Sequence, residues 1–389
     1  MGKEKNKLLI TGISANRIKW KAGITLVGIS FSTFRNPIRA LKAIRLLFNQ
    51  RNRLHGNRKD HKIVKSGDHY YWSIYTPGFP SDRFNNVIKR EIRRALSTTG
   101  GGIPLQTLIL SVSSRCEYKC KHCFEADNLN GKEHLTIQDL SRVMEDAVQN
   151  GVRHIQFGGG EPMLRMEDMI RIMVQAHGTM DFWLSTSGFG LTPEKAALLK
   201  KAGMTGATIS LDHWNKDDHD RFRNFSGAFD FAVEAVENCN AAGIITNLTL
   251  CVTREMATED NLIRYLEFAR ELQVPFVRFL EPRKVGNYAG KDVLLREKEQ
   301  RIVLDFYLRM NSHRKYSSYP IIQYPGYHQR KLGCFGSGNR YLYINSKGDY
   351  QGCPFCPGTV GNIRHMNLQA AISLLQSRGC QLFRTNYET

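Results

Sequence analysis

The sequence contains no run of about 18 uncharged apolar residues, the length at which a helix begins to span a bilayer, so a protein with several membrane-spanning helices is excluded. Low-complexity tracts are also lacking and the apolar content is an ordinary 41%, which excludes disorder as the dominant state. Residues 22–34 are apolar but have no small-residue cleavage site before Arg35, which argues against a cleavable signal peptide. The 389 residues suffice for two or three domains.

Acidic residues are scarce in the first hundred positions. Residues 1–100 contain 21 Lys or Arg and 5 Asp or Glu, whereas residues 101–389 contain 34 and 31. The net charge of +19 therefore belongs mainly to an N-terminal extension, residues 1–104. Such a segment favours an acidic partner, and anionic lipid, nucleic acid and an acidic protein all fit this description.

Within this extension, Pro37 favours the start of a helix over residues 38–50, with Arg39 and Lys42 on one face. The opposite face is apolar and carries Ile38, Leu41, Ile44, Leu47 and Phe48. One interpretation is a helix packed on the main domain with its basic face in solvent. The alternative is an interfacial helix on an anionic membrane, with contact through residues 1–60. Residues 69–75 alternate like a strand and precede a turn at residues 77–80.

From residue 105 to residue 315 the pattern becomes regular. The expected strands are residues 107–112, 152–157, 182–186, 207–211, 246–252 and 276–280, and the expected helices are residues 136–150, 167–176, 193–201, 229–242, 258–272 and 297–310. This alternation predicts an α/β fold, a partial (β/α)6 TIM-like barrel with a parallel sheet. The regularity ends after residue 315, and residues 316–389 are expected to form a third unit.

Seven of the nine cysteines fall in two groups, which are Cys116, Cys120 and Cys123, and then Cys334, Cys353, Cys356 and Cys380. Short-spaced thiols in a large chain indicate metal chemistry in a reducing compartment, so we expect a cytoplasmic protein. The first group lies just after the first predicted strand, where the loops of such sheets form sites. Three unevenly spaced thiolates are a poor zinc knuckle, but they suit a [4Fe-4S] cluster with one iron left open.

Two further motifs lie in phase with the cysteine loop: Gly159-Gly160-Glu161-Pro162 after the second strand and Ser210-Leu211-Asp212 at the end of the fourth. With them, residues 105–315 resemble the radical S-adenosylmethionine (SAM) superfamily. The resemblance implies that the three thiolates hold a [4Fe-4S] cluster whose fourth iron binds the amino and carboxylate groups of SAM. It also implies that the glycine turn approaches that amino group and that Glu161 helps to hold its positive charge.

By the same resemblance, Ser210 and Thr186 contact the methionyl or ribose part of SAM, although either hydroxyl also suits a strand-end cap. The sequence departs from the family at His122, because the residue before the third cysteine is usually aromatic, packing near the adenine. A histidine ring stacks in a similar way. The implied chemistry is reductive cleavage of SAM to a 5′-deoxyadenosyl radical, which abstracts hydrogen from an unidentified substrate, with ferredoxin or flavodoxin as the electron donor.

The second cysteine group contains Cys334, Cys353, Cys356 and Cys380. Residues 341–350 read as a hairpin that turns at residues 346–348 and brings Cys334 near Cys353. The spacing Cys-x13-Gly-x4-Cys resembles the opening of a SPASM domain, and four cysteines resemble its shortened "twitch" form with one auxiliary [4Fe-4S] cluster. Structural zinc is the alternative. Cys239 or Cys251 could replace Cys380 as a ligand, but both are expected in the core.

Rival functions remain at this point. A peptide-modifying enzyme would recognise a leader peptide by adding a strand at residues 70–75. A nucleic-acid-binding iron–sulfur protein would use the basic extension. However, no nucleic-acid-binding motif is present, and nucleic acid is not expected as a partner. A zinc scaffold would have no catalysis. The substrate is left open among a peptide, a sugar and a lipid-linked molecule. Glu281, Asp212, Tyr324 and Tyr327 lie near the expected barrel mouth but are more simply structural or solvated.

Overall fold

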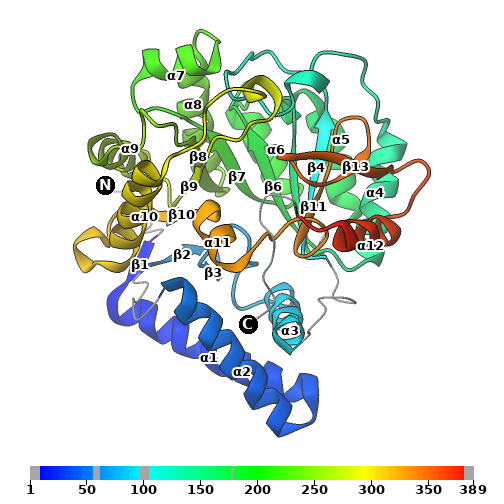
Figure 1. Cartoon of the computed structure of the whole chain (residues 1–389), viewed down its shortest axis with the longest axis vertical. Coiled ribbons are helices and arrows are strands. Elements are labelled where there is room, and N and C mark those ends of the chain that lie inside the picture. The colour runs from blue at the N-terminus through cyan, green and yellow to red at the C-terminus, as the bar shows by residue number, and fades with distance from the viewer. Residues whose placement is uncertain (1–8, 56–61, 97–104, 177, 381–389) are drawn as a thin grey trace.

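The computed structural model describes residues 9–55, 62–96, 105–176 and 178–380. Its parallel strands are β4 (Thr107–Ser113), β5 (His154–Gly159), β6 (Asp181–Thr186), β7 (Met204–Ser210), β8 (Ile245–Cys251), β9 (Phe276–Leu280) and β10 (Ile321–Gln323). They pair side by side in this order and form an open, curved sheet, which is a partial TIM barrel (Figure 1). The six strands expected from the sequence are confirmed within a few residues.

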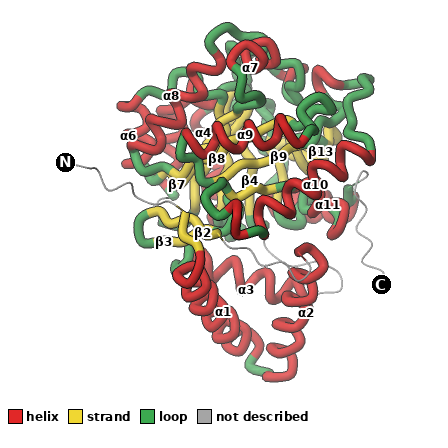
Figure 2. The backbone as a smooth tube through the Cα atoms, turned by 90° about the vertical axis from the view of Figure 1, so that its left-hand side faces the viewer, coloured by secondary structure: helices red, strands yellow, loops and turns green. Residues whose placement is uncertain are grey.

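Helices follow the strands and cover the outer face of this sheet (Figure 2). They are α4 (Ile137–Gln149), α5 (Met166–Gln175), α6 (Pro193–Lys201), α7 (Lys216–Arg223), α8 (Ala228–Ala241), α9 (Glu259–Glu271) and α10 (Glu297–Ser312). Local chemistry sets their ends: Thr136 caps α4 by accepting from the Asp139 amide, and the Asp139 carboxylate accepts from the Thr136 amide in return. The short helix α7 was not expected from the sequence.

Successive side chains along the strands point alternately into the core under the helices and into the interior of the barrel. In β4 and β5 the side chains of Leu108, Leu110 and Phe157 point outward into the main core under the helices. Their neighbours Ile109 and Gln156 line a cavity inside the barrel. A strand places successive side chains on opposite faces, so one apolar face holds the helices while the other is free to carry polar groups.

The C-terminal unit continues the same sheet. Strands β11 (Tyr341–Ile344), β12 (Asp349–Cys353) and β13 (Cys356–Asn362) follow β4, with β11 parallel to β4 and antiparallel to β12. The expected hairpin is confirmed, and Gly348 at its turn has φ 87°, a left-handed conformation that favours glycine. Helix α11 (Pro325–Leu332) follows β10, and α12 (Leu368–Arg378) follows β13.

The N-terminal extension has two parts. Strands β1 (Leu9–Thr11), β2 (Lys62–Ser66) and β3 (His69–Tyr71) form an antiparallel sheet. Its Val64 and Tyr71 pack with Trp183, Ile245 and Phe276, which close the amino end of the barrel. Large apolar side chains therefore fill the amino end of the barrel.

The second part is a helical unit of α1 (Gly12–Phe34), α2 (Pro37–His55) and α3 (Asp82–Leu96), which projects from the body (Figures 1 and 2). Its small core joins Ile29, Ala43 and Ile92, one from each helix. The predicted helix beginning near Pro37 is confirmed, and α1 was not expected. None of the described helices combines the length and apolarity needed to cross a bilayer.

The structure differs from two interpretations of this extension. The helix at residues 38–50 buries Ala40 and Ala43, and its Leu47 packs partly buried beside them, but Ile38 is 76% exposed. The strand ends at Tyr71, and the backbone of Tyr70 already exchanges two hydrogen bonds with Phe79. Residues 70–75 therefore offer no free edge for an added peptide strand.

Candidate active site

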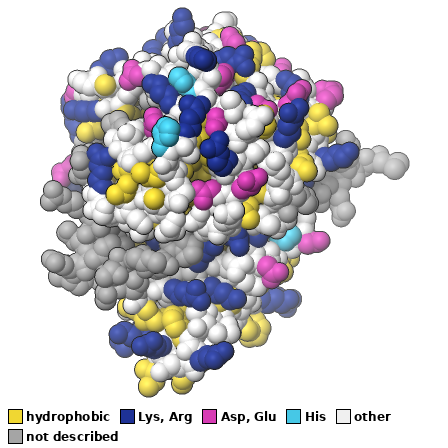
Figure 3. Space-filling model, turned by 90° about the vertical axis from the view of Figure 1, so that its right-hand side faces the viewer, with side chains coloured by type: hydrophobic (Ala, Val, Ile, Leu, Met, Phe, Trp, Pro, Cys, Tyr) yellow, Lys and Arg dark blue, Asp and Glu magenta, His cyan; other side chains and the backbone are white. Residues whose placement is uncertain are grey.

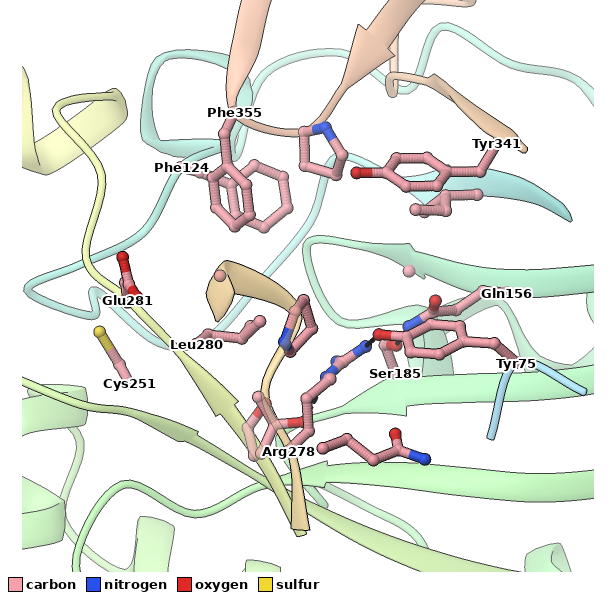
Figure 4. A pocket seen from close by; sticks show the side chains of 18 of the residues that line it. Tyr75, Phe124, Gln156, Ser185, Cys251, Arg278, Leu280, Glu281, Tyr341 and Phe355 are labelled. Carbon is pink, nitrogen blue, oxygen red and sulfur yellow. Dashed lines mark hydrogen bonds between the residues drawn. The ribbon is translucent and has the colours of Figure 1, made fainter. Parts of the chain in front are cut away.

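A cavity of about 750 Å³ occupies the interior of the barrel (Figure 4). The cysteine loop and the glycine turn line one part of it, including Cys116, Cys120 and Cys123. Residues 72–76 of the N-terminal extension and Pro354 and Phe355 of the C-terminal unit line other parts. All three parts of the chain therefore contribute to one space.

Each thiol of the triplet has a hydrogen-bond donor at its sulfur. The backbone N–H of Tyr118 donates to Cys116 and that of Glu125 donates to Cys123. The guanidinium of Arg223 donates to the sulfur of Cys120 over 3.7 Å. Donors at the sulfur stabilise thiolates and adjust the potential of an iron–sulfur cluster, so the donor set fits that group.

Apolar side chains surround the same thiols, with Tyr118, Phe189 and Phe225 as the largest. The rings of Tyr118 and Phe225 stack with centroids 4.3 Å apart. This burial raises the pKa of Cys116 and of Cys123 to about 12. The bare pocket thus disfavours thiolates, and iron would supply the positive charge that stabilises them.

The glycine turn packs against the backbone of the cysteine loop. The Gly160 amide donates to Ser113 O over 2.9 Å, and the Glu161 amide donates to Arg115 O over 2.7 Å. A Cβ on Gly160 would lie 2.2 Å from the carbonyl oxygen of Arg115. The glycine is therefore required by the approach of two backbones, in addition to any approach to a ligand. Pro162 is buried at the start of the turn of 3-10 helix that follows.

The carboxylate of Glu161 is buried and organises the end of β6. It accepts hydrogen bonds from the hydroxyls of Thr186 and Ser187, both over 2.6 Å, and from the amides of Ser187 and Met163. Burial raises its pKa despite these donors. The Thr186 hydroxyl also accepts from the Gly188 amide, so it serves as a strand-end cap in this structure. Glu161 and Thr186 nevertheless both line the cavity.

A buried ion pair joins the end of β7 to the short helix α7. Arg223 Nη2 lies 2.5 Å from Asp212 Oδ2, and Asp212 Oδ1 accepts from the Cys251 amide. Burial alone would raise the pKa of Asp212, but Arg223 holds that pKa below its ordinary value. The Asp212 amide donates to Nδ1 of His219. Through Arg223, this network reaches the sulfur of Cys120.

The sequence reasoning named Asp212 but missed Arg223 and His219. A signal was available, because these two residues lie four apart, on one face of a helix, directly after the Ser210-Leu211-Asp212 strand end. Ser210 lines the cavity. His122 also lines it and stacks on Phe222 at 4.7 Å, and burial lowers its pKa to about 4, which leaves the ring neutral.

Glu281 and Tyr324 form a separate polar group at the cavity wall. The Tyr324 hydroxyl donates to Glu281 Oε1 over 2.6 Å, and Arg330 Nη1 donates to the same oxygen over 2.6 Å. Tyr327 packs in the main core, against Tyr307. Glu281 is thus held in an ion pair, which fits the structural role expected for it.

The C-terminal cysteines lie together, as the hairpin predicted for Cys334 and Cys353. The thiol of Cys380 is within hydrogen-bonding reach of Cys334 and Cys356, and Cys356 is within reach of Cys353. Cys239 lies in the core, and Cys251 at the cavity wall, away from this group. In the described part of the chain, no group of three or more His, Cys, Asp or Glu side chains has the geometry for a single metal ion.

Aromatic contacts connect the two cysteine groups across the cavity. Phe124, next to Cys123, packs edge-on against Phe355, which lies between Cys353 and Cys356, with centroids 5.7 Å apart (Figure 4). Phe124 also packs against Tyr343 of β11. The C-terminal cysteine turn therefore faces the same space as the triplet.

Comparison with known proteins addresses the core directly. Residues 110–269 match the family model of the Radical SAM superfamily. They form a radical SAM domain. The family uses a [4Fe-4S] cluster and SAM, and the curated relatives of this chain are enzymes, which argues against a non-catalytic zinc scaffold. The three thiols and their donors fit such a cluster.

The alignments with curated relatives cover only part of each relative's length. The chain is 31% identical to a GTP 3′,8-cyclase of Marinobacter nauticus over 47% of this chain and 56% of the relative. It is 26% identical to a GTP 3′,8-cyclase of Acidothermus cellulolyticus, over 64% of this chain and 67% of the relative. It is also 26% identical to an Fe-coproporphyrin III synthase of Methanosarcina barkeri, over 51% of this chain and 50% of the relative. The chain thus spans between half and two thirds of these curated relatives.

Solved structures share the fold over more of the chain. Streptococcus suis SuiB, bound to its precursor peptide SuiA, aligns with a TM-score of 0.57 at 16% identity, covering 80% of this chain and 73% of SuiB. The enzyme anSMEcpe with bound AdoMet aligns with a TM-score of 0.57 at 19% identity, covering 72% of this chain and 85% of anSMEcpe. At these identities the likeness establishes the fold alone.

Proposed function

We propose that this chain is a radical SAM enzyme that abstracts a hydrogen atom from a substrate held in the barrel cavity. The observation that carries the proposal is that the cysteine triplet, the glycine turn and the C-terminal cysteine turn line one cavity. When bound, the [4Fe-4S] cluster and SAM supply the 5′-deoxyadenosyl radical that removes the hydrogen atom.

The chain's own residues would bind, orient and exclude water. Cys116, Cys120 and Cys123 would hold the cluster, with the N–H donors at their sulfurs favouring the thiolate form. Glu161 would place a buried negative charge near the glycine turn, where it suits an ammonium group. The apolar shell around Tyr118 would keep water from the reacting region.

We also propose that Cys334, Cys353, Cys356 and Cys380 hold a second, auxiliary [4Fe-4S] cluster, as in a twitch-type domain. Their mutual contacts and the position of Phe355 in the cavity wall support a role near the substrate. Structural zinc is the competing occupant, because four cysteines on a hairpin also suit that ion.

Metal analysis of anaerobically purified protein tests both proposals. We expect about eight irons and eight sulfides per chain, falling to about four in a Cys116/Cys120/Cys123→Ala variant and to about four in a Cys353/Cys356→Ala variant. The control is Cys239→Ala, a core thiol outside both groups, which should keep about eight. Only the triplet variant should lose formation of 5′-deoxyadenosine with dithionite.

Other outcomes separate the two proposals. About four irons and one zinc in the wild type, with zinc lost only from the Cys353/Cys356→Ala variant, would replace the auxiliary cluster by structural zinc. Protein without iron after anaerobic reconstitution would contradict the radical SAM function itself.

The substrate stays open among a peptide, a sugar and a lipid-linked molecule. SuiB and anSMEcpe bind peptides in solved structures, which keeps a peptide among the candidates. The backbone of Tyr70 is already paired with Phe79 and offers such a peptide no free strand edge. A peptide would therefore have to be bound in the cavity through contacts with side chains. A ferredoxin or flavodoxin is proposed as the electron donor.

A second proposal concerns the helical unit α1–α2, which we propose to dock on an anionic membrane surface. One stripe of α1 is apolar and exposed, with residues spaced three, four or seven apart, namely Ile13, Trp20, Ile24, Val27 and Phe31. Helix α2 adds Ile38, Leu41 and Phe48. Trp20 is 70% exposed and Ile38 is 76% exposed, unlike the residues of a packed helix.

The charge of this unit supports an anionic membrane as the occupant of its exposed apolar surface. The 44 residues of 12–55 contain nine Lys or Arg and no Asp or Glu. At the lower end of Figure 3, hydrophobic and basic side chains lie side by side on this unit. Apolar side chains that enter the acyl boundary, flanked by cations that pair with lipid phosphates, are the signature of an interfacial helix.

Vesicle co-sedimentation tests the docking proposal. We expect binding to vesicles that contain phosphatidylglycerol, weaker binding to pure phosphatidylcholine, and loss of binding in a Trp20/Ile24/Phe31→Ser variant. The matched control is Leu198/Leu374→Ser, which removes exposed apolar side chains elsewhere on the molecule. Equal binding to both vesicles, unchanged binding of the Trp20/Ile24/Phe31→Ser variant, or retention of RNA without vesicle binding would contradict the proposal.

A further inference from the structure

Polar side chains from four strands form a layer across the inside of the barrel. Gln156 of β5, Ser185 of β6 and Arg278 of β9 line the cavity (Figure 4). Thr249 of β8 lines it as well. Gln156 Nε2 donates to Ser185 Oγ over 2.6 Å. Below this layer the barrel is closed by large apolar side chains, so the polar layer forms the floor of the cavity.

Arg278 is the charged member of this layer, and it is only 9% exposed. Its Nε donates to Thr249 Oγ1 over 3.2 Å and its Nη1 donates to the Tyr75 hydroxyl over 3.1 Å. A guanidinium carries five N–H groups, so three remain for another partner. Both hydroxyl partners are neutral, and they orient the guanidinium without compensating its charge.

The other arginines that line the cavity differ from Arg278, because each has a carboxylate partner. Arg223 pairs with Asp212, Arg283 with Glu281, and Arg340 with Glu91. Arg278 forms no ion pair with any carboxylate among the described residues. A buried charge without a counter-charge is costly, and proteins retain one where a ligand supplies the opposite charge.

We propose that Arg278 binds an anionic group of the substrate, a carboxylate or a phosphate, at the floor of the cavity. The planar guanidinium fork matches either group in a bidentate geometry. This assignment rests on the proposed function, since it takes the cavity as the substrate site. It also gives the N-terminal extension a part in substrate recognition, because Tyr75 orients the guanidinium.

A buried acceptor with no hydrogen-bond partner in the described part of the chain lies on the residue paired with Arg278 in the sheet. Gln323 of β10 is the Cα partner of Arg278 in the sheet, and it lines the same cavity. Its Nε2 donates to Ser73 Oγ over 3.2 Å, while its Oε1 is buried without a hydrogen-bond partner among the described residues. A buried acceptor beside a buried cation suits a substrate with a hydrogen-bond donor near its anionic group.

Anion binding to the holoenzyme tests the proposal, with inorganic phosphate and glutarate as the two probes in calorimetric titrations at constant chloride. We expect wild type to bind at least one probe, and its preference identifies phosphate or carboxylate as the group. Arg278→Met should weaken that binding at least about tenfold, as expected for loss of a charged hydrogen-bonding partner, and Arg278→Lys should lie between. Arg283→Met removes the same charge from the cavity wall and should change binding less than about threefold.

The affinity for SAM, measured by equilibrium dialysis, separates the alternatives. We expect wild-type affinity for SAM in Arg278→Met and Arg278→Lys. A parallel loss of SAM binding would assign Arg278 to SAM and overturn the proposal, as would equal losses in Arg278→Met and Arg283→Met or no binding of either probe to wild type. Phosphate binding through Arg278 in protein that fails the iron assay would retain the anion site and reject the proposed radical chemistry.

Discussion

Replacing Gly160 by alanine is the most direct test of how the structure builds the cysteine loop. The added Cβ would lie 2.2 Å from Arg115 O and 3.2 Å from Cys116 Cβ. The first separation is well inside van der Waals contact, and the atom it meets is backbone, which cannot rotate away. The two segments must therefore move apart.

The magnitude follows from what that movement disturbs. Two backbone hydrogen bonds join the segments, from Gly160 N to Ser113 O and from Glu161 N to Arg115 O. Weakening both costs about 1 kcal/mol each, and overpacking adds about 1–3 kcal/mol. We expect Gly160→Ala to lower the free energy of unfolding by about 3–5 kcal/mol.

Urea denaturation of the reduced, metal-free protein measures this loss without a contribution from bound iron. Gly131→Ala is the matched control, because a Cβ at Gly131 meets no atom within 4 Å and this residue has no positive φ. We expect it to be neutral or slightly stabilising. A change below about 0.5 kcal/mol in Gly160→Ala would refute the reasoning, since the loop would then accommodate the Cβ freely.

Three further predictions concern parts of the fold that support the site, each measured by urea denaturation of the metal-free protein. Thr136→Ala removes the cap of α4 and should cost about 1 kcal/mol, and unchanged stability would contradict the capping role. Trp183→Ala opens a hole between the barrel and β2–β3, so a loss of about 3–5 kcal/mol is expected. Glu91→Gln should destabilise the contact of α3 with Arg340 at neutral pH. Burial opposes ionisation of Glu91, but Arg340 and Arg94 hold its pKa below the ordinary 4.5, so its contribution is present above pH 4.5 and fades as the pH falls further. A stability difference that persists at low pH would contradict that linkage.

Local patterns were sufficient for the barrel and for the cysteine triplet. Each strand from β4 to β9 is a short apolar or β-branched run followed by a helix, so its position depends on neighbours in the chain. Cys116, Cys120 and Cys123 lie within eight residues, and their loop follows a strand whose end must face the site.

The tertiary structure alone decided which faces are buried and which charges are paired. The large apolar side chains of α2 suggested its packing face, but Ala43 is the fully buried residue of α2 in the core with α1 and α3, and Leu47 is only partly buried there, because close helix contact requires small residues. The edge expected at Tyr70 is occupied by Phe79, a contact that depends on the path of the chain between them.

Arg278 and Arg223 illustrate the same limit at the site. Nothing local in the sequence separates the two arginines by partner, yet Arg223 meets Asp212 and Cys120 whereas Arg278 meets only hydroxyl groups among its described partners. Whether a buried charge has a counter-charge depends on residues from distant strands and from the N-terminal extension. The sequence by itself therefore determined the fold class and the position of the cysteine loop, and the assembled barrel decided which charges are compensated and which stripe of α1 is exposed.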